Sequence, residues 1–233
     1  MAGVEYRVAR MNKLTEIHGV VFDMDGVLID SHPAHRESWR EFLHSLDKKV
    51  SEAELDFILD GHTREEILRH FLGNLSTIEM LAYGKRKDEY FRIHEHRIEP
   101  IQGVFAFLER LKSSGVSCAI ATSASEIRTF ATIERMGIAQ YFAAVVTARD
   151  VTIGKPDPLV YQLACERLNL SPQAAIAFED APSGVQSARS AGMRCIGISS
   201  NGLRQQLLHA GAEQVIPDFL ELTLPPFIRA AWV

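Results

Sequence analysis

Two aspartates that follow an apolar segment are the residues best suited to chemistry in this sequence. Residues 18–22 form a short apolar run, and Asp23 and Asp25 come directly after it, followed by Gly26. Two carboxylates at the end of a buried strand are costly unless a cation or a proton partner lies near them. The pair therefore indicates a cation site or acid–base chemistry, with an aspartate-rich turn as the alternative.

Three further polar segments follow apolar runs in the same way. Thr122 and Ser123 offer hydroxyl donors suited to phosphate oxygens. Lys155 supplies a cation in a Gly-Lys-Pro loop, and Glu179 and Asp180 form a second acidic pair. Each alone has a simpler explanation, because such residues also cap helices or lie in solvated loops. Since ligands bind at the carboxyl ends of parallel strands, the segments together predict one crevice.

The segments that must position these residues alternate between strand and helix patterns. Between the apolar runs lie stretches with apolar residues at helical spacing, such as residues 104–111 and 160–168. This alternation predicts an α/β fold with a Rossmann-like parallel sheet and helices on both of its faces. The expected strands are residues 18–22, 116–121, 143–146, 174–178 and 194–198, with a short sixth strand at 215–216.

A long insertion interrupts the alternation after the first strand. About 90 residues separate the first two expected strands, far more than a usual crossover needs. Most of the insertion has helical spacing, including one long helix expected over residues 80–98. We therefore expect a discontinuous catalytic core of residues 16–30 and 100–224, and a small helical-bundle cap domain formed by residues 31–99.

The composition excludes several other classes of protein. The 233 residues include 25 Lys and Arg against 30 Asp and Glu, a net charge of −5, whereas nucleic-acid binders are usually basic. No apolar run is long enough to span a membrane, and residues 1–16 lack the apolar segment of a signal peptide. Three widely spaced cysteines favour a reducing compartment. We expect a cytoplasmic monomer or weak homo-oligomer that binds neither nucleic acid nor membrane.

In order and strand placement, the polar segments resemble the four motifs of the haloacid dehalogenase-like hydrolase superfamily. The similarity covers about residues 19–212, and its most specific stretches are residues 154–158 and 178–184. It implies phosphoryl transfer through an aspartyl-phosphate. The presence of Asp25 argues against dehalogenation, because true dehalogenases lack an aspartate at that position. P-type ATPases carry threonine there and need membrane spans.

The resemblance also implies a role for each motif residue. Asp23 would attack phosphorus in line, and Asp25 would act as the general acid and then as the general base. Thr122 and the backbone of Ser123 would bind phosphoryl oxygens. Lys155 would neutralise charge in the transition state and steady Asp23.

A Mg²⁺ cofactor is part of the same implication. The side chains of Asp23 and Asp180 and the backbone carbonyl of Asp25 would hold the ion, and Glu179 would support it directly or through water. Mg²⁺ prefers hard oxygen ligands of this kind. The ion would let a carboxylate approach an anionic phosphate.

The insertion resembles the helical cap of the phosphoglycolate-phosphatase and β-phosphoglucomutase branch. The resemblance assigns substrate binding to five positions that match the mutase: His35, Trp39, Gly61, Arg64 and Lys87. Simpler explanations stay open for most of them. Trp39 suits a core position, Arg64 suits a pair with a nearby carboxylate, and His35 and Lys87 suit a solvated surface.

The sequence thus predicts a Mg²⁺-dependent phosphatase for a small phosphorylated metabolite, with a sugar phosphate as the expected substrate. A β-phosphoglucomutase-like phosphohexomutase is the alternative, because it uses the same aspartyl-phosphate. Departures from the mutase cap at His62, Glu66 and Ile67 leave that choice open. A response-regulator receiver also carries Asp, Thr or Ser and Lys at strand ends, but it is about half as long and has no cap.

Overall fold

Six strands in the described part of the chain form the parallel sheet that the sequence predicts. The structure, a computed structural model, describes residues 17–59, 64–199 and 202–220. The strands pair in the order β5-β4-β1-β6-β7-β8, each pair parallel, which puts the strand before Asp23 in the middle. They are β1 (Gly19–Phe22), β4 (Ser117–Ala121), β5 (Ala144–Val146), β6 (Ala175–Glu179), β7 (Arg194–Ile198) and β8 (Gln214–Ile216).

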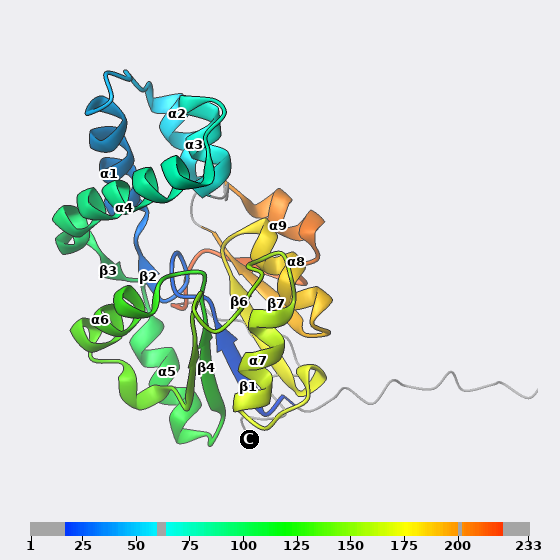
Figure 1. The fold of residues 1–233 in the computed structure, drawn as a ribbon. Coiled ribbons are helices and arrows are strands. Elements are labelled where there is room, and N and C mark those ends of the chain that lie inside the picture. The colour runs from blue at the N-terminus through cyan, green and yellow to red at the C-terminus, as the bar shows by residue number, and fades with distance from the viewer. Residues whose placement is uncertain (1–16, 60–63, 200–201, 221–233) are drawn as a thin grey trace, which may run out of the picture.

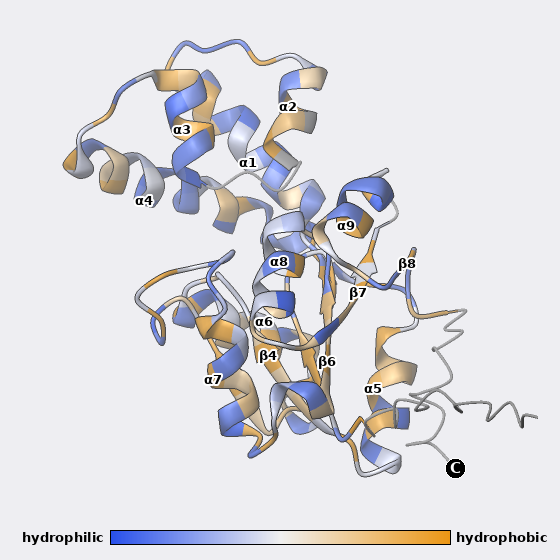
Figure 2. Cartoon of the chain, turned by 90° about the vertical axis from the view of Figure 1, so that its right-hand side faces the viewer, coloured by the Kyte–Doolittle hydropathy of each residue, from blue (hydrophilic) through white to orange (hydrophobic). Residues whose placement is uncertain are grey.

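Helices cover both faces of this sheet (Figure 1). Val20 and Phe22 of β1 pack on one face with Phe107, while Val21 packs on the other face with Tyr161. Strands buried on both faces read as continuous apolar runs, and Figure 2 shows them as hydrophobic ribbons inside the molecule. The helices are α5 (Val104–Ser113) and α6 (Glu126–Met136) on the first face, and α7 (Leu159–Arg167), α8 (Pro182–Ser190) and α9 (Arg204–Ala210) on the second.

The insertion folds as a separate group of helices above the sheet (Figure 1). These are α1 (His32–His44), α2 (Glu52–Leu59), α3 (Arg64–Leu72) and α4 (Thr77–His94). They bury a cluster of their own that includes Trp39, Phe42 and Leu68. No helix in the described ranges is both long and apolar enough to cross a membrane.

The helix α4 differs from the expected helix at both ends. It begins at Thr77 because Ser76 and Glu79 form a capping box, in which each side chain binds the other residue's backbone N–H. It ends at His94, and a 3₁₀ turn, η1 (Glu95–Arg97), follows it. Two other 3₁₀ turns among the described residues lie before strands: η2 (Ala139–Tyr141) and η3 (Pro172–Ala174).

A two-stranded antiparallel ribbon joins the helical insertion to the sheet domain. Its strands, β2 (Ile29–Asp30) and β3 (Glu99–Pro100), lie at the two points where the chain leaves and re-enters the sheet domain. Sequence reasoning missed both, because two residues carry no alternation pattern. The domain limits at 30/31 and 99/100 stay a prediction, and the predicted core residues 16 and 221–224 lie outside the described ranges.

Candidate active site

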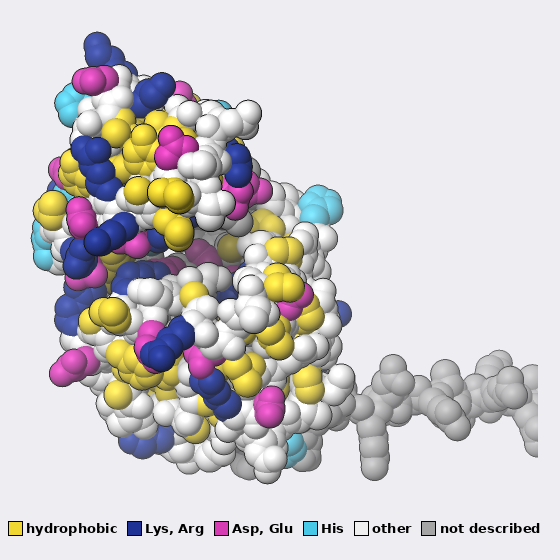
Figure 3. Space-filling model, viewed as in Figure 1, with side chains coloured by type: hydrophobic (Ala, Val, Ile, Leu, Met, Phe, Trp, Pro, Cys, Tyr) yellow, Lys and Arg dark blue, Asp and Glu magenta, His cyan; other side chains and the backbone are white. Residues whose placement is uncertain are grey.

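A pocket of about 920 Å³ lies between the helical insertion and the carboxyl ends of the strands. In Figure 3 it opens as a groove with acidic and basic side chains along it. The structure brings nearly all of the predicted site residues to this pocket. They are Asp23, Asp25, Thr122, Ser123, Lys155, Glu179 and Asp180 from the sheet domain and His35, Trp39, Arg64 and Lys87 from the insertion. Gly61 lies outside the described residues.

Lys155 joins two of the predicted carboxylates. Its Nζ donates to Asp23 Oδ1 at 2.5 Å, to the carbonyl oxygen of Ala121 at 3.0 Å, and to Glu179 Oε1. The Tyr161 hydroxyl donates to the same Glu179 oxygen at 2.8 Å. Only 7% of the Lys155 side chain and 1% of the Glu179 side chain are exposed, so these charges compensate each other inside the protein.

The pKa values of Asp23 and Lys155 are both raised at this point of the pocket. Burial raises the pKa of Asp23 well above its ordinary value, with Lys155 opposing the shift and the carboxylates of Glu179 and Asp180 adding to it. Burial alone would lower the pKa of Lys155, but the carboxylates of Asp23 and Glu179 hold it above its ordinary value. Lys155 therefore stays charged beside the predicted nucleophile.

The loop after β1 holds both aspartates in a tight turn. The backbone N–H of Leu28 donates to the carbonyl of Met24 at 3.0 Å, and that of Gly26 donates to Ile29 at 2.7 Å. Gly26 has a φ of +70°, and a Cβ there would lie 2.0 Å from Asp180 Oδ2. Two reasons therefore require glycine at position 26: the left-handed backbone conformation, and the close approach of Asp180 from the second acidic motif.

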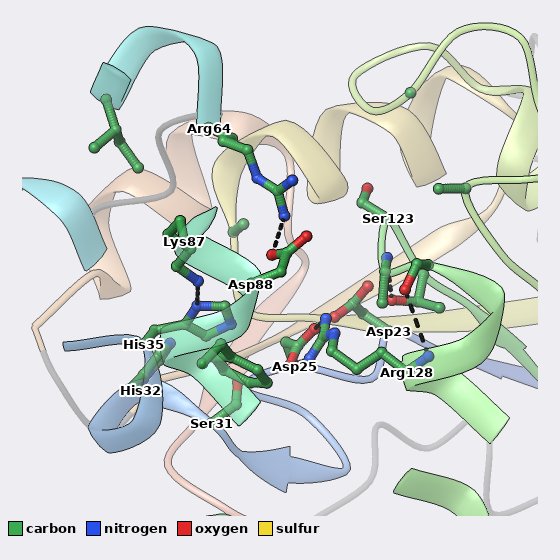
Figure 4. Close-up of a pocket in the computed structure, with 18 of the residues that line it drawn as sticks. Asp23, Asp25, Ser31, His32, His35, Arg64, Lys87, Asp88, Ser123 and Arg128 are labelled. Atoms are coloured by element: carbon green, nitrogen blue, oxygen red, sulfur yellow. Dashed lines mark hydrogen bonds and ion pairs between the residues drawn. The ribbon is translucent and has the colours of Figure 1, made fainter. Parts of the chain in front are cut away.

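Arg128 is a site residue that sequence reasoning missed. Its Nη1 donates to Asp25 Oδ1 at 2.9 Å, and its Nη2 donates to Asp25 Oδ2 (Figure 4). Burial by itself would raise the pKa of Asp25, but the Arg128 guanidinium holds it well below its ordinary value. An arginine in the first turns of a helix is usually a surface residue, so its position in the chain gave no signal of this contact.

The predicted phosphoryl-binding residues lie where β4 ends. Thr122 is buried, and its Oγ1 accepts a hydrogen bond from the backbone N–H of Ala124 at 3.1 Å. Because a hydroxyl that accepts one hydrogen bond can still donate its own proton, Thr122 is free to donate to a phosphate oxygen. Ser123 is exposed and lines the pocket beside it.

Lys87 lies inside the protein, which rules out the solvated-surface explanation for this residue. Lys87 is 2% exposed, and its Nζ lies 2.9 Å from His35 Nδ1. The ammonium also lies over the rings of Phe91 and Trp39, at 4.8 and 5.4 Å from their centroids. Burial, with the nearby cations Arg64 and Arg128, lowers the pKa of Lys87 to about 7. Burial and Lys87 likewise lower the pKa of His35 well below its ordinary value.

Trp39 and Arg64 agree both with the predicted place at the substrate pocket and with the simpler explanations, a core position and an ion pair. Trp39 is 3% exposed and packs edge-on against Phe42, so it is a core residue that also lines the pocket. Arg64 pairs with Asp88 at 2.7 Å, and both side chains are about half exposed at the pocket wall. Figure 4 shows this pair above Asp23 and Asp25.

The donor set at the strand ends suits a hard cation such as Mg²⁺. Four carboxylates (Asp23, Asp25, Glu179 and Asp180) line this end of the pocket with two permanent cations, Lys155 and Arg128. In formal charge the carboxylates exceed these two cations, and Mg²⁺ prefers carboxylate and carbonyl oxygens as ligands. Burial raises the pKa of Asp180, with Glu179 adding to the shift and His32 opposing it.

The same carboxylates are turned toward protein cations in this structure. Within the described residues, no three acidic, histidine or cysteine side chains converge closely enough to hold a metal ion. Asp23 and Glu179 face Lys155, and Asp180 Oδ2 lies 3.3 Å from His32 Nε2. The residues therefore fit Mg²⁺ by their chemistry, while Asp180 Oδ2 faces His32 in this structure.

Comparison with known proteins assigns this arrangement to a family. A sequence model described as haloacid dehalogenase-like hydrolase matches residues 20–198, which include all four motifs. The chain belongs to this family. The predicted family and fold class are thereby confirmed, and this haloacid dehalogenase-like hydrolase is an enzyme.

Three relatives show how closely this haloacid dehalogenase-like hydrolase matches known proteins. It is 33% identical over 204 residues to a phosphorylated carbohydrates phosphatase of Thermotoga maritima, covering 86% of this chain and 94% of the relative. It is 29% identical over 214 residues to a β-phosphoglucomutase of Bacillus subtilis, covering 88% and 91% of the two chains. A solved HAD hydrolase, family IA, variant 3, from Entamoeba histolytica superimposes with a TM-score of 0.83 at 28% identity, covering 92% and 99%.

Proposed function

We propose that this enzyme is a Mg²⁺-dependent phosphatase that hydrolyses a phosphate monoester of a small metabolite. The expected substrate is a sugar phosphate. The observation that carries the proposal is the buried Asp23–Lys155–Glu179 chain, which faces the same pocket as Thr122. The relative that acts on phosphorylated carbohydrates supports the substrate class. Three buried cysteines without disulfides, Cys118, Cys165 and Cys195, support a reducing compartment such as the cytoplasm.

In the proposed mechanism, Asp23 attacks the phosphorus and Asp25 transfers the protons. Lys155 holds the Asp23 carboxylate in one orientation and keeps a positive charge beside it throughout the reaction. Asp25 protonates the leaving oxygen and then takes a proton from the attacking water. Thr122 and Ser123 bind phosphoryl oxygens, and the insertion limits the access of bulk water to the pocket.

Mg²⁺ would be held by the side chains of Asp23 and Asp180 and the backbone carbonyl of Asp25, with Glu179 in support. Such an ion offsets the repulsion between a carboxylate nucleophile and an anionic phosphate. The Asp25 carboxylate faces Arg128, which agrees with a role for its backbone rather than its side chain in holding the ion.

Replacing the nucleophile tests this proposal. Purified enzyme with Mg²⁺ should release inorganic phosphate from members of a sugar-phosphate panel, and Asp23→Asn should abolish release, because an amide cannot form the acyl-phosphate. Asp218→Asn, which lies outside the pocket, is the control and should keep full activity. Turnover by Asp23→Asn would contradict the nucleophile, and no release from any member of the panel would reject the function.

A phosphohexomutase is the second candidate function. The Lys87–His35 pair and Arg64 occupy the positions that match a mutase cap, and the chain is 29% identical to a β-phosphoglucomutase. With β-glucose 1-phosphate and a trace of bisphosphate, a mutase forms glucose 6-phosphate, whereas a phosphatase releases phosphate. The ratio of these products decides between the two.

A further inference from the structure

Arg64 and Asp88 form an ion pair on the wall that the insertion contributes to the pocket. Arg64 Nη2 donates to Asp88 Oδ1 at 2.7 Å, and 49% and 48% of the two side chains are exposed. The pair joins the start of α3 to α4, above Asp23 and Asp25 in Figure 4. A substrate whose reacting phosphate lies at Asp23 therefore presents its far end to this pair.

Two positions of α4 hold the arginine in place. Gly84 and Asp88 are four residues apart, so they lie on the same face of the helix. A Cβ at Gly84 would lie 3.1 Å from Arg64 Nη1 and 3.3 Å from Arg64 Cδ, and a methyl group there would crowd the arginine. Glycine weakens a helix interior relative to alanine, but here it gives the Arg64 side chain room to lie against α4.

The hydrogen-bonding capacity of the pair suits hydroxyl groups better than a second phosphate. A guanidinium only donates and an ionised carboxylate only accepts, whereas a sugar hydroxyl can do both. Hydroxyl groups can therefore bind Arg64 and Asp88 together. A phosphate dianion only accepts, so it would bind Arg64 but face the like charge of Asp88, and juxtaposed like charges oppose binding.

Neither space nor a lack of positive charge excludes a second phosphate from this end of the pocket. The volume of about 920 Å³ is near the upper end of the range for small-molecule sites. Lys85 and Arg92 line the same wall as Arg64 and would attract an anion. The group that opposes a second phosphate beside Arg64 is therefore the carboxylate of Asp88.

We propose that Asp88 is a specificity-determining residue, which makes the enzyme select phosphate monoesters whose far end carries hydroxyl groups over those with a second phosphate. This inference rests on the proposed function, in which the reacting phosphate lies at Asp23. The same selection opposes binding of the bisphosphate on which a phosphohexomutase depends. It therefore favours the phosphatase over the second candidate function.

Rates of phosphate release from matched substrates test this selection. The pairs are fructose 1-phosphate with fructose 1,6-bisphosphate and glucose 1-phosphate with glucose 1,6-bisphosphate, at constant ionic strength and constant free Mg²⁺. In wild-type enzyme, kcat/KM should be lower for the bisphosphate of each pair. Asp88→Asn should raise the ratio of bisphosphate to monophosphate kcat/KM about tenfold, mainly through KM. This is the lower end of the effect of a hydrogen bond to a charged group, since the pair is half exposed.

Two further variants separate selection from a structural role of the ion pair. Arg64→Met leaves the Asp88 carboxylate without this guanidinium, so the ratio should fall, opposite to its rise in Asp88→Asn. Loss of a merely structural ion pair would move the ratio in the same direction in both variants, or leave it unchanged. Glu89→Gln removes the same charge from an exposed position of α4 outside the pocket and should keep the wild-type ratio.

Inhibition constants complete the test. For a sugar phosphate that is not turned over, the constant for inhibition of p-nitrophenyl phosphate hydrolysis gives the same ratio. An unchanged ratio in Asp88→Asn, a shift in the same direction in Arg64→Met, or a wild-type preference for the bisphosphates would overturn the inference and leave the phosphatase intact. If wild-type enzyme releases phosphate from neither the sugar phosphates nor p-nitrophenyl phosphate, the proposed function itself has failed, and the inference fails with it.

Discussion

Lys87 is the residue whose environment differs most from what its neighbours in the sequence indicate. It follows Lys85 and Arg86 in a charged stretch of α4, yet it is buried against His35 and the rings of Phe91 and Trp39. A buried ammonium without a carboxylate partner in these contacts loses hydration that the aromatic rings restore only in part. A buried lysine at this point of the pocket therefore lowers the stability of the folded protein.

Replacing Lys87 with methionine should stabilise the protein, most of all below about pH 7. The pKa of Lys87 is about 7 in the folded protein, against an ordinary value of 10.5. Below the lower value both states are charged and the folded state bears the full burial cost. Between the two values the unfolded state binds more protons, so wild-type stability rises with pH and the advantage of the variant shrinks.

Urea unfolding at two pH values measures this change. The stability difference between Lys87→Met and wild type should be on the order of 3 kcal/mol smaller at about pH 9.5 than at about pH 6. Lys85→Met, at an exposed position of the same helix, is the control for the loss of a lysine from α4. The same pH response in both variants would contradict a buried charge at Lys87.

At the scale of elements, the start of α8 is shaped around the end of β6. Gly184 lies in the first turn of α8, and a Cβ there would lie 1.9 Å from Glu179 Oε1. The missing side chain leaves room for the buried carboxylate that pairs with Lys155 and Tyr161. The absence of a side chain at Gly184 in α8 therefore allows the Glu179 carboxylate to occupy its position at the end of β6.

The variant Gly184→Ala should lose activity and stability, because displacing the buried Glu179 carboxylate costs more than the helix gains. Alanine favours the helix by about 1 kcal/mol, but its Cβ must displace the Glu179 carboxylate from Lys155. We expect the Mg²⁺ concentration for half-maximal activity to rise about ten- to hundredfold, as for other changes next to metal ligands. Ser190→Ala, at the exposed end of the same helix, is the matched control. Wild-type Mg²⁺ dependence in Gly184→Ala would show that Glu179 tolerates the shift.

The strands and their ends were predictable because their signals are local. An apolar run that is buried on both faces ends where polar residues begin, so β1 and β6 were found together with Asp23 and Glu179. The contact of Arg128 with Asp25 was not predictable, because the two residues are 103 positions apart and depend on the direction of one side chain. The predicted strands therefore located the edge of the sheet where the site lies. The contacts across the pocket depend on tertiary packing, so they could be found only in the structure.

Over the whole molecule, charge is distributed unevenly around the pocket. The net charge of −5 would repel an anionic substrate. The wall formed by the insertion, however, has more cations than anions: Arg64, Lys85, Lys87 and Arg92 against Asp88 and Glu95. A substrate anion therefore meets a locally favourable field on that side, while the opposite side carries the excess of carboxylates.

Because of that excess, Mg²⁺ should raise the melting temperature of the enzyme. An ion that binds only the folded state at about 100 times its dissociation constant adds about 2.7 kcal/mol of stability. For a chain of this size we expect a rise of about 5 °C or more. Asp180→Asn should lose most of the rise, Asp218→Asn should keep it, and potassium chloride at equal ionic strength should not reproduce it. An equal rise in Asp180→Asn would contradict the assigned ligands.

The ribbon of β2 and β3 has a consequence for how such a protein changes over evolutionary time. Asp30 and Glu99 are direct partners in this ribbon, and partners in antiparallel strands have Cα atoms only about 5 Å apart. A gap of that size is closed by a two-residue turn. The ends of the insertion therefore lie side by side, so a change in its length need not change where the chain leaves and re-enters the sheet domain.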